Sequence, residues 1–170
     1  AFIFLPDYIE VYGVDYYEQS VSAMEEITQF ITCEFAVRPF FLKYYKQMTQ
    51  QMLQWSLHEN LHVRRLASEG IRPRLPWAMA VPILKKNPEP IFPILENLKD
   101  DSSEYVRRSV ANNLNDISKD HQEEVITLIK RWNKDTKERQ KLIKHAARTL
   151  LKQGNQEVMS LFGFGAVNQI

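Results

Sequence analysis

The stretch VRRSVANNLN, residues 106–115, decides the fold because other segments of the chain resemble it. The related segments are AVRPFFLKYY (36–45), VRRLASEGIR (63–72) and IKHAARTLLK (143–152). Each opens on a small or β-branched residue, continues with basic residues and then places apolar residues at helical spacing. A second amphipathic segment follows each of them: MTQQMLQWSL, PIFPILENLK, EEVITLIKRW and QEVMSLFGF. The pattern therefore predicts repeated pairs of helices.

The spacing of these segments indicates the type of repeat. They start 27, 43 and 37 residues apart, and the last two intervals are close to the roughly 40-residue period of HEAT-type helix pairs. A proline-rich insertion, RPRLPWAMAVP (72–82), lengthens the middle interval. Helix pairs that cannot bury their apolar faces alone stack into a curved solenoid. We therefore expect an all-α, HEAT-like solenoid with a concave basic surface.

Helical periodicity extends along nearly the whole chain, and strand-like alternation is missing from the sequence. The expected helices are 18–31, 35–45, 47–57, 61–70, 77–85, 90–98, 103–117, 122–132, 138–152 and 156–162. Most of the prolines fall where a helix is expected to start, turn or kink. We expect a single repeat domain over residues 1–170, either complete or the visible part of a longer chain.

Composition and charge point to a soluble protein with an anionic partner. The chain is 44% hydrophobic and 25% charged, which is ordinary for a globular protein, and no apolar run approaches the roughly 20 residues that cross a bilayer. A single cysteine, Cys33, excludes an internal disulfide framework, so we expect a cytoplasmic location. The net charge is +1, but residues 105–152 carry 12 basic and 6 acidic residues. This bias favours nucleic acid as partner, although a set of solvated helix faces explains it equally well.

The helix expected over 103–117 has polar side chains beside its apolar stripe. The stripe consists of Val106, Val110, Leu114 and Ile117. Asn113 lies inside the edge of the stripe, Ser109 and Asp116 lie just beyond it, and Asn112 comes next. Two interpretations remain open. Arginine–carboxylate pairs and asparagine ladders are ordinary structural features of helices, and the same groups could instead form a functional site.

The repeats suggest that these polar groups share a surface. Alignment places Arg38 and Arg65 in the register of Arg108, and Glu69 in the register of Asn112. Equivalent helices of a solenoid point the same way, so we expect these side chains to converge. The segment RPRLPW (72–77) adds two arginines and a tryptophan, which suit phosphate contact and stacking on a base.

The tryptophan of this segment also has a structural interpretation. Trp77 could pack between repeats, as we expect of Trp55 and Trp132 at the ends of their helices. Metal chemistry is not expected, because Asn60 should break or cap the helix between His58 and His62, and no cysteine cluster supports a metal site. The other histidines, His121 and His145, are isolated in the sequence and expected at the surface or at helix ends.

Three motifs give the chain a family resemblance: CEFAVRPF (33–40), HVRRLASEGIRPRLPWA (62–78) and SEYVRRSVANNLNDISKDH (103–121). They resemble the DNA alkylation repair glycosylases of the AlkC branch, which are related to the AlkD-type HEAT-like proteins. The resemblance extends from about Asp7 to Phe164 and departs from the family at Cys33, where serine is common. Some members add a carboxy-terminal immunoglobulin-like domain, which we expect to be missing here or not included, because the chain ends at Ile170 soon after the last expected helix.

The resemblance implies that the concave face holds double-stranded DNA with alkylated bases. The implied activity is hydrolysis of the N-glycosidic bond of cationic methylated bases, chiefly 3-methyladenine. By motif, Asp116 corresponds to the catalytic carboxylate, Glu69 and Trp77 to groups that line the lesion, and Glu34 to a further active-site acid. Basic candidates for contacting DNA or holding these acids are Arg38, Arg65, Arg72, Arg74, Arg108, Lys144 and Arg148. Ser109, Asn112 and Asn113 are then read as supporting residues.

The chemistry of this reaction suits a site built from carboxylates. A cationic base leaves as a neutral molecule, so no general acid is needed, and a carboxylate can stabilise the oxocarbenium-like sugar and orient water. No cofactor is expected. Because no lysine is placed beside Asp116 in a pattern that suggests a Schiff base, we predict a monofunctional glycosylase. The alternative is a catalytically inactive HEAT-repeat module that binds DNA or protein, and the sequence leaves the oligomeric state open.

Overall fold

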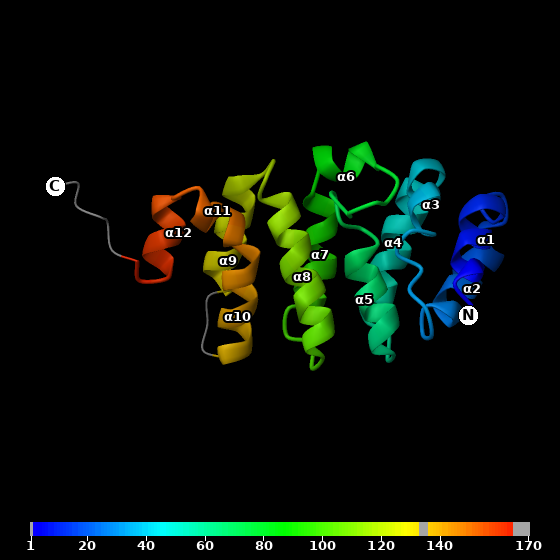
Figure 1. The fold of residues 1–170 in the computed structure, drawn as a ribbon, viewed down its shortest axis with the longest axis horizontal. Helices are drawn as coiled ribbons and strands as arrows, with labels where there is room; N and C mark the ends of the chain where they lie inside the picture. The colour runs from blue at the N-terminus through cyan, green and yellow to red at the C-terminus, as the bar shows by residue number, and fades with distance from the viewer. Residues whose placement is uncertain (1, 133–135, 165–170) are drawn as a thin grey trace.

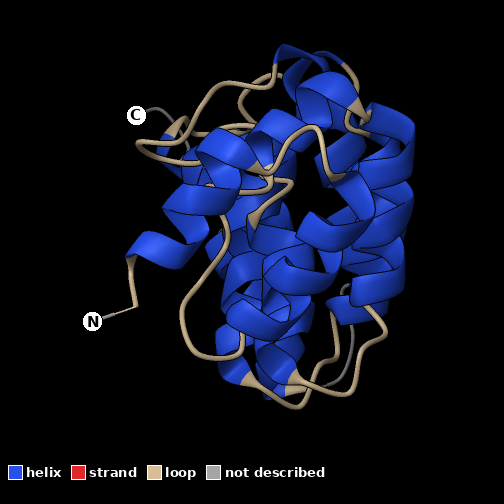
Figure 2. Cartoon of the chain, turned by 90° about the vertical axis from the view of Figure 1, so that its right-hand side faces the viewer, coloured by secondary structure: helices blue, strands red, loops and turns tan. Residues whose placement is uncertain are grey.

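The computed structural model describes residues 2–132 and 136–164, and every regular element in these ranges is a helix (Figures 1 and 2). This confirms the all-α prediction. In chain order the elements are α1 (Phe4–Tyr12), α2 (Tyr17–Ile27), α3 (Arg38–Lys43), α4 (Tyr45–Trp55), α5 (Leu61–Glu69), α6 (Pro82–Lys86), the 3-10 turn η1 (Glu89–Ile91), α7 (Phe92–Leu98), α8 (Glu104–Ile117), α9 (Gln122–Trp132), α10 (Lys137–Ala146), α11 (Arg148–Lys152) and α12 (Gln156–Leu161).

The helices stack along one direction, so that elements distant in sequence become neighbours. Figure 1 shows α5, α8 and α10 standing side by side, and α8 packs against both of the others. Helix α4 packs on α5 and on α7, and α7 in turn contacts α8. The three aligned helices carry three of the four related sequence segments, so the repeats are equivalent in space as well as in sequence.

The apolar stripe of α8 forms part of a continuous core. Its four residues are at most 1% exposed, and burying each such side chain contributes roughly 1.5–3 kcal/mol. Because α8 lies between two neighbours, its flanking polar residues Ser109, Asn113 and Asp116 are buried as well. Trp55 and Trp132 pack in the core as predicted, each donating its indole N–H to a glutamate.

The structure differs from the predicted helices in three places. Helix α1 is not among the expected helices, and Pro6 lies in its first turn, where proline is tolerated. Residues 77–81 are not helical, because Trp77 has a φ of 61° and Pro82 starts α6. The helix predicted over 138–152 is interrupted at Ala147, where ψ is 2°. Asn60 caps α5 by accepting the His62 amide at 2.8 Å, as predicted.

Candidate active site

The predicted site is built around a buried arginine that links two helices. Arg72 comes just after α5 in the chain. Its Nε donates to Asp116 Oδ2 on α8 at 2.9 Å, and its Nη2 lies 2.8 Å from the same oxygen. Its Nη1 donates to Glu69 Oε1 at 2.5 Å. All three side chains are less than 10% exposed. We call Glu69, Arg72 and Asp116 the carboxylate cluster.

Polar residues of α8 orient Glu69 within this cluster. Ser109 donates its hydroxyl to Glu69 Oε2 at 2.6 Å, and Asn113 donates its amide to the Ser68 carbonyl at 2.7 Å. Both contacts join α8 to α5 across 40 or more residues of sequence. Asn112 differs, because its Oδ1 lies 2.8 Å from His145 Nε2 on α10 and accepts from Arg148 on α11 at 3.1 Å. Only two of the three predicted supporting residues therefore contact α5.

Glu34 lies at the edge of the cluster and is joined to it by Arg65. Arg65 Nη1 donates to Glu34 Oε2 at 2.6 Å, and Nη2 lies 3.7 Å from Glu69 Oε1. The Arg65 guanidinium also lies 4.7 Å from the centre of the Tyr105 ring. The structure thus brings Glu34, Glu69 and Asp116 into one connected network, with the arginines between them.

The electrostatic balance at Arg72 favours a permanent positive charge. Burial alone would lower the pKa of Arg72, but the charges of Glu69 and Asp116 outweigh burial and raise it. A buried cation between two carboxylates fixes their positions and limits their mutual repulsion. Among the described residues, no group of three or more His, Cys, Asp or Glu side chains is arranged to hold a metal ion.

The surroundings of Asp116 differ from the prediction in one respect. Lys119, one turn further along the chain, places Nζ 3.3 Å from Asp116 Oδ1. A lysine therefore does lie beside the predicted catalytic carboxylate. The sequence contains this signal, because residues three apart near a helix end share a face.

Trp77 is displayed to solvent rather than packed between repeats. Its side chain is 97% exposed, and it is the one non-glycine residue with positive φ in the described parts of the chain. An L-residue in this conformation is strained and persists where its surroundings impose it. The interpretation of Trp77 as a core residue is therefore wrong. Trp77 belongs to a loop over residues 70–81, which we call the Trp77 loop. The same loop contains Arg72 and therefore connects Trp77 to the carboxylate cluster.

Arg38 does not lie where a DNA contact could form. It is 1% exposed and donates to backbone carbonyls of the Trp77 loop, so its predicted role in contacting DNA is wrong. It departs from its repeat equivalents, Arg65 and Arg108, because its guanidinium reaches the carbonyls of Gly70 and Arg72 just after α5. Arg74 is less buried and forms a forked pair with Asp120 at 2.9–3.1 Å.

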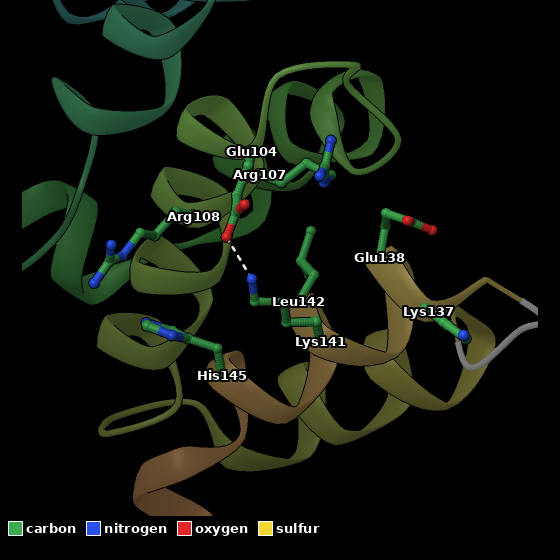
Figure 3. Close-up of a pocket in the computed structure, with 8 residues that line it drawn as sticks. All are labelled: Glu104, Arg107, Arg108, Lys137, Glu138, Lys141, Leu142 and His145. Atoms are coloured by element: carbon green, nitrogen blue, oxygen red, sulfur yellow. Dashed lines mark hydrogen bonds and ion pairs between the residues drawn. The ribbon is translucent and has the colours of Figure 1, made fainter.

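A basic groove lies between α8 and α10 (Figure 3). The cavity is about 390 Å³ and is lined by Glu104, Arg107, Arg108, Lys137, Glu138, Lys141, Leu142 and His145. In Figure 3, Glu104 and Lys141 face each other across the two helices, while Arg108 and His145 lie at the same end of the groove. The remaining predicted basic residues lie nearby on α10 and α11, with Lys144 exposed and Arg148 half-buried.

His145 is a groove residue that sequence reasoning missed. It is half-buried, and its Nε2 lies 2.8 Å from Asn112 Oδ1 and also contacts Arg148. Burial lowers the pKa of His145, and the nearby charges of Arg148 and Arg108 lower it further. No local pattern marks this residue, because Asn112, its partner across the groove, lies 33 residues away in the sequence.

Comparisons with known proteins agree with this architecture. The family model "DNA alkylation repair enzyme" matches residues 13–151. YhaZ of Bacillus subtilis (strain 168) is 51% identical over 168 residues, which cover 99% of this chain and 47% of that protein. The chain thus spans about half the length of this curated relative.

Solved structures show the same likeness. Alkylpurine DNA glycosylase AlkC of Pseudomonas fluorescens, bound to DNA containing an abasic site analog, matches with a TM-score of 0.93 and 47% identity. This match covers 96% of the present chain and 46% of the AlkC chain. AlkD2 of Streptococcus mutans matches with a TM-score of 0.67 and 29% identity over 80% of the present chain and 68% of its own. The chain therefore belongs to the DNA alkylation repair enzyme family.

Proposed function

We propose that this chain is a monofunctional DNA glycosylase that hydrolyses the N-glycosidic bond of cationic methylated bases, chiefly 3-methyladenine, in double-stranded DNA. The observation that carries the proposal is the carboxylate cluster, in which Arg72 holds Asp116 and Glu69 together and belongs to the same loop as the exposed Trp77. Family membership and the likeness to a glycosylase bound to an abasic site analog support it. We place the activity in the cytoplasm, where the buried thiol of Cys33 would remain reduced.

In this proposal, Asp116 acts on the sugar. A methylated cationic base needs no proton from the protein to leave, so the barrier depends on the positive charge that develops on the sugar. A fixed carboxylate stabilises that charge and orients the attacking water. Arg72 holds Oδ2 of Asp116 from two nitrogens, which leaves Oδ1 as the atom that faces the reaction.

Access to Oδ1 requires Lys119 to move. Asp116 is 2% exposed, whereas the Lys119 side chain is 37% exposed and its contact with Oδ1 is long, at 3.3 Å. A DNA phosphate offers this ammonium a competing partner. We therefore infer that DNA draws Lys119 away as it binds, so that the carboxylate becomes available only when substrate is present.

The other acids favour a cationic lesion. Glu34 and Glu69 lie on the same arginine network as Asp116, and three carboxylates with two arginines leave one net negative charge when Lys119 is withdrawn. This charge attracts a methylated base over neutral adenine. The exposed ring of Trp77 supplies a face for a cation–π contact. We expect DNA to bend against this surface, with Arg108, Lys144 and Arg148 following its backbone.

A catalytically inactive DNA-binding or scaffold module is the second candidate. The observation that favours it is the completeness of the ion pairing, since each acid of the cluster already has a basic partner. Pairs of this kind also occur where they only stabilise a fold. The two functions differ in whether Asp116 is needed for base release or only for stability.

The test is release of 3-methyladenine from alkylated DNA, followed by chromatography of the freed bases. We expect release by the wild-type chain and a loss on the order of 100-fold or more in Asp116→Asn and Asp116→Ala, since a charge-stabilising group is removed. Asp100→Asn is the matched control, because Asp100 is an exposed carboxylate at the end of α7, paired with Arg139 outside the cluster. If folded wild-type protein released no 3-methyladenine, the proposed glycosylase activity would be refuted. Equal release by the Asp116 variants would refute only the role of Asp116.

A further inference from the structure

Arg38 makes an unusual set of contacts for a buried arginine. It is 1% exposed, and its donors meet only backbone carbonyls: Nε donates to Met79 at 2.9 Å, and Nη1 donates to Gly70 at 2.9 Å and to Arg72 at 2.8 Å. No carboxylate lies within 4.0 Å of this guanidinium among the residues that the structure describes. Three bonds from one side chain therefore hold the Trp77 loop at both of its ends.

The loop is also fixed by close packing where it begins. A Cβ atom on Gly70 would lie 2.7 Å from Val37 Cγ2 and 3.0 Å from the Leu66 carbonyl. The end of α5 thus approaches the residue before Arg38 more closely than any side chain would allow. This approach brings the Gly70 carbonyl within reach of the guanidinium.

The charge on Arg38 is costly for the fold. Burial lowers its pKa to about 10, and the neighbouring charge of Arg72 contributes to the shift. The group remains protonated at neutral pH, without an ion pair to offset the loss of hydration. A residue needed only for packing at this position would be apolar, so the contacts with the loop are what distinguish arginine here.

The held segment contains two groups of the proposed reaction. Arg72 lies at one of the fixed carbonyls and orients Asp116, and Trp77 lies between the fixed points with a strained φ of 61°. Strained residues persist where the surrounding structure determines them. The Arg38 bonds to Arg72 and Met79 bracket the strained residue on both sides.

We propose that Arg38 is a positioning residue of the glycosylase reaction: it fixes the Trp77 loop so that Trp77 faces the lesion and Arg72 presents Asp116 to the sugar. This inference rests on the proposed function. Arg38 does not touch DNA, and its effect is transmitted through the backbone of residues 70–79. Misplacement of a reacting group by about 1 Å costs on the order of 100-fold in rate.

The test compares Arg38→Lys and Arg38→Met with a matched control, Arg64→Met. Arg64 is a partly buried arginine of α5 that binds Asp101 and the carbonyls of His58 and Glu59, away from the loop. Two measurements are made on each protein. The first is functional: the single-turnover rate of 3-methyladenine release, together with the affinity for DNA that contains an abasic site analog. The other is the 19F NMR spectrum after labelling of the three tryptophans with 5-fluorotryptophan.

The expected result is specific to Arg38. In Arg38→Met the Trp77 resonance shifts or sharpens while those of Trp55 and Trp132 stay in place, and the excision rate falls on the order of 10- to 100-fold with a smaller loss of affinity. Arg38→Lys keeps the charge and shows an intermediate loss of excision rate. This variant provides the test if Arg38→Met does not fold. Arg64→Met leaves the Trp77 resonance and the excision rate unchanged.

The proposal would be overturned by an unchanged Trp77 resonance in folded Arg38 variants, or by unchanged excision despite a shifted resonance. Equal losses of excision in Arg64→Met would also overturn it, since the effect would then follow general destabilisation. If the wild-type chain releases no base, the proposed function fails, and the Trp77 resonance alone decides whether Arg38 positions the loop.

Discussion

At the scale of single residues, Arg72 is the connection on which the site depends. It bonds to Glu69 at the end of α5 and to Asp116 on α8, which lies 44 residues further along the chain. Removing one partner of a buried ion pair typically costs about 3–5 kcal/mol. The same interaction therefore stabilises the contact between α5 and α8 and fixes the proposed catalytic carboxylate. Stability and activity should be strongly linked at Arg72 and separable at exposed residues such as Trp77.

Trp77 offers the clearest separation of stability from activity. We expect Trp77→Gly to be more stable than Trp77→Ala by roughly 0.5–1 kcal/mol, because glycine relieves the positive φ while giving back part of this gain as chain entropy. Both variants should lose base release, since both lack the ring. Urea denaturation measures the difference in the free energy of unfolding, and an alanine variant as stable as the glycine variant would contradict the backbone strain.

Lys119 provides a second test at this scale. Because its ammonium pairs with Asp116 in the free protein and, in the proposed mechanism, with a phosphate when DNA is bound, we expect no covalent complex with abasic DNA when borohydride is added. Lys119→Gln should behave like the wild-type protein in this trapping assay. A trapped complex that disappears in Lys119→Gln would show that the enzyme is bifunctional and would identify the nucleophile.

At the scale of elements, the contact between α8 and α10 contains the pH-sensitive group. Burial and the charges of Arg148 and Arg108 lower the pKa of His145 in the folded state, so the unfolded chain binds a proton more readily. The contribution of His145 to stability is therefore complete above about pH 6.5, the pKa of a histidine in the unfolded chain. It is lost as the pH falls below that value. Helix α10 should loosen from α8 under mildly acidic conditions.

The corresponding prediction concerns His145→Gln. Its free energy of unfolding should depend less on pH between about 7 and 5.5 than that of the wild-type protein. Urea denaturation at several pH values measures this slope. His121→Gln is the control, because His121 lies outside the groove and contacts Glu124 and the Lys85 carbonyl. Equal slopes in wild-type protein and His145→Gln would contradict the assignment.

At the scale of the whole molecule, the stacked helices place the basic side chains in one region. Arg108 and Lys144 come from two neighbouring helices and are exposed, and the groove between these helices is lined largely by basic groups. Basic side chains that contact DNA phosphates release counterions, so binding weakens as salt rises. The stack should therefore bind DNA through a continuous path from α8 to α10.

Salt dependence tests this path. We expect the slope of log affinity against log salt concentration to become shallower by about 1 in each of Arg108→Gln and Lys144→Gln. Lys130→Gln is the matched control, because Lys130 lies on α9 and pairs with Glu157. Fluorescence anisotropy with a labelled duplex measures the slope. A wild-type slope in both groove variants would exclude these residues from the DNA contact.

No helix in the described residues has the length and apolar character to cross a membrane.

The helical order of the stack followed from the sequence, since periodicity of about 3.6 residues and the spacing of the repeats are local properties. The buried stripe of α8 and the grouping of Glu69 with Asp116 were predicted on the same basis. A helical register specifies which residues share a face, and the repeat specifies which faces meet.

The tertiary structure decided what each polar residue contacts. Arg38 has the register of Arg65 and Arg108, yet it turns inward, because the end of α5 supplies carbonyl acceptors at that level of the stack. Asn112 contacts His145 on α10 and Arg148 on α11 rather than α5, and Trp77 projects into solvent from a backbone conformation that no local preference of tryptophan favours. These outcomes depend on contacts between segments more than 30 residues apart, so sequence determined the helices and their order while packing determined the site.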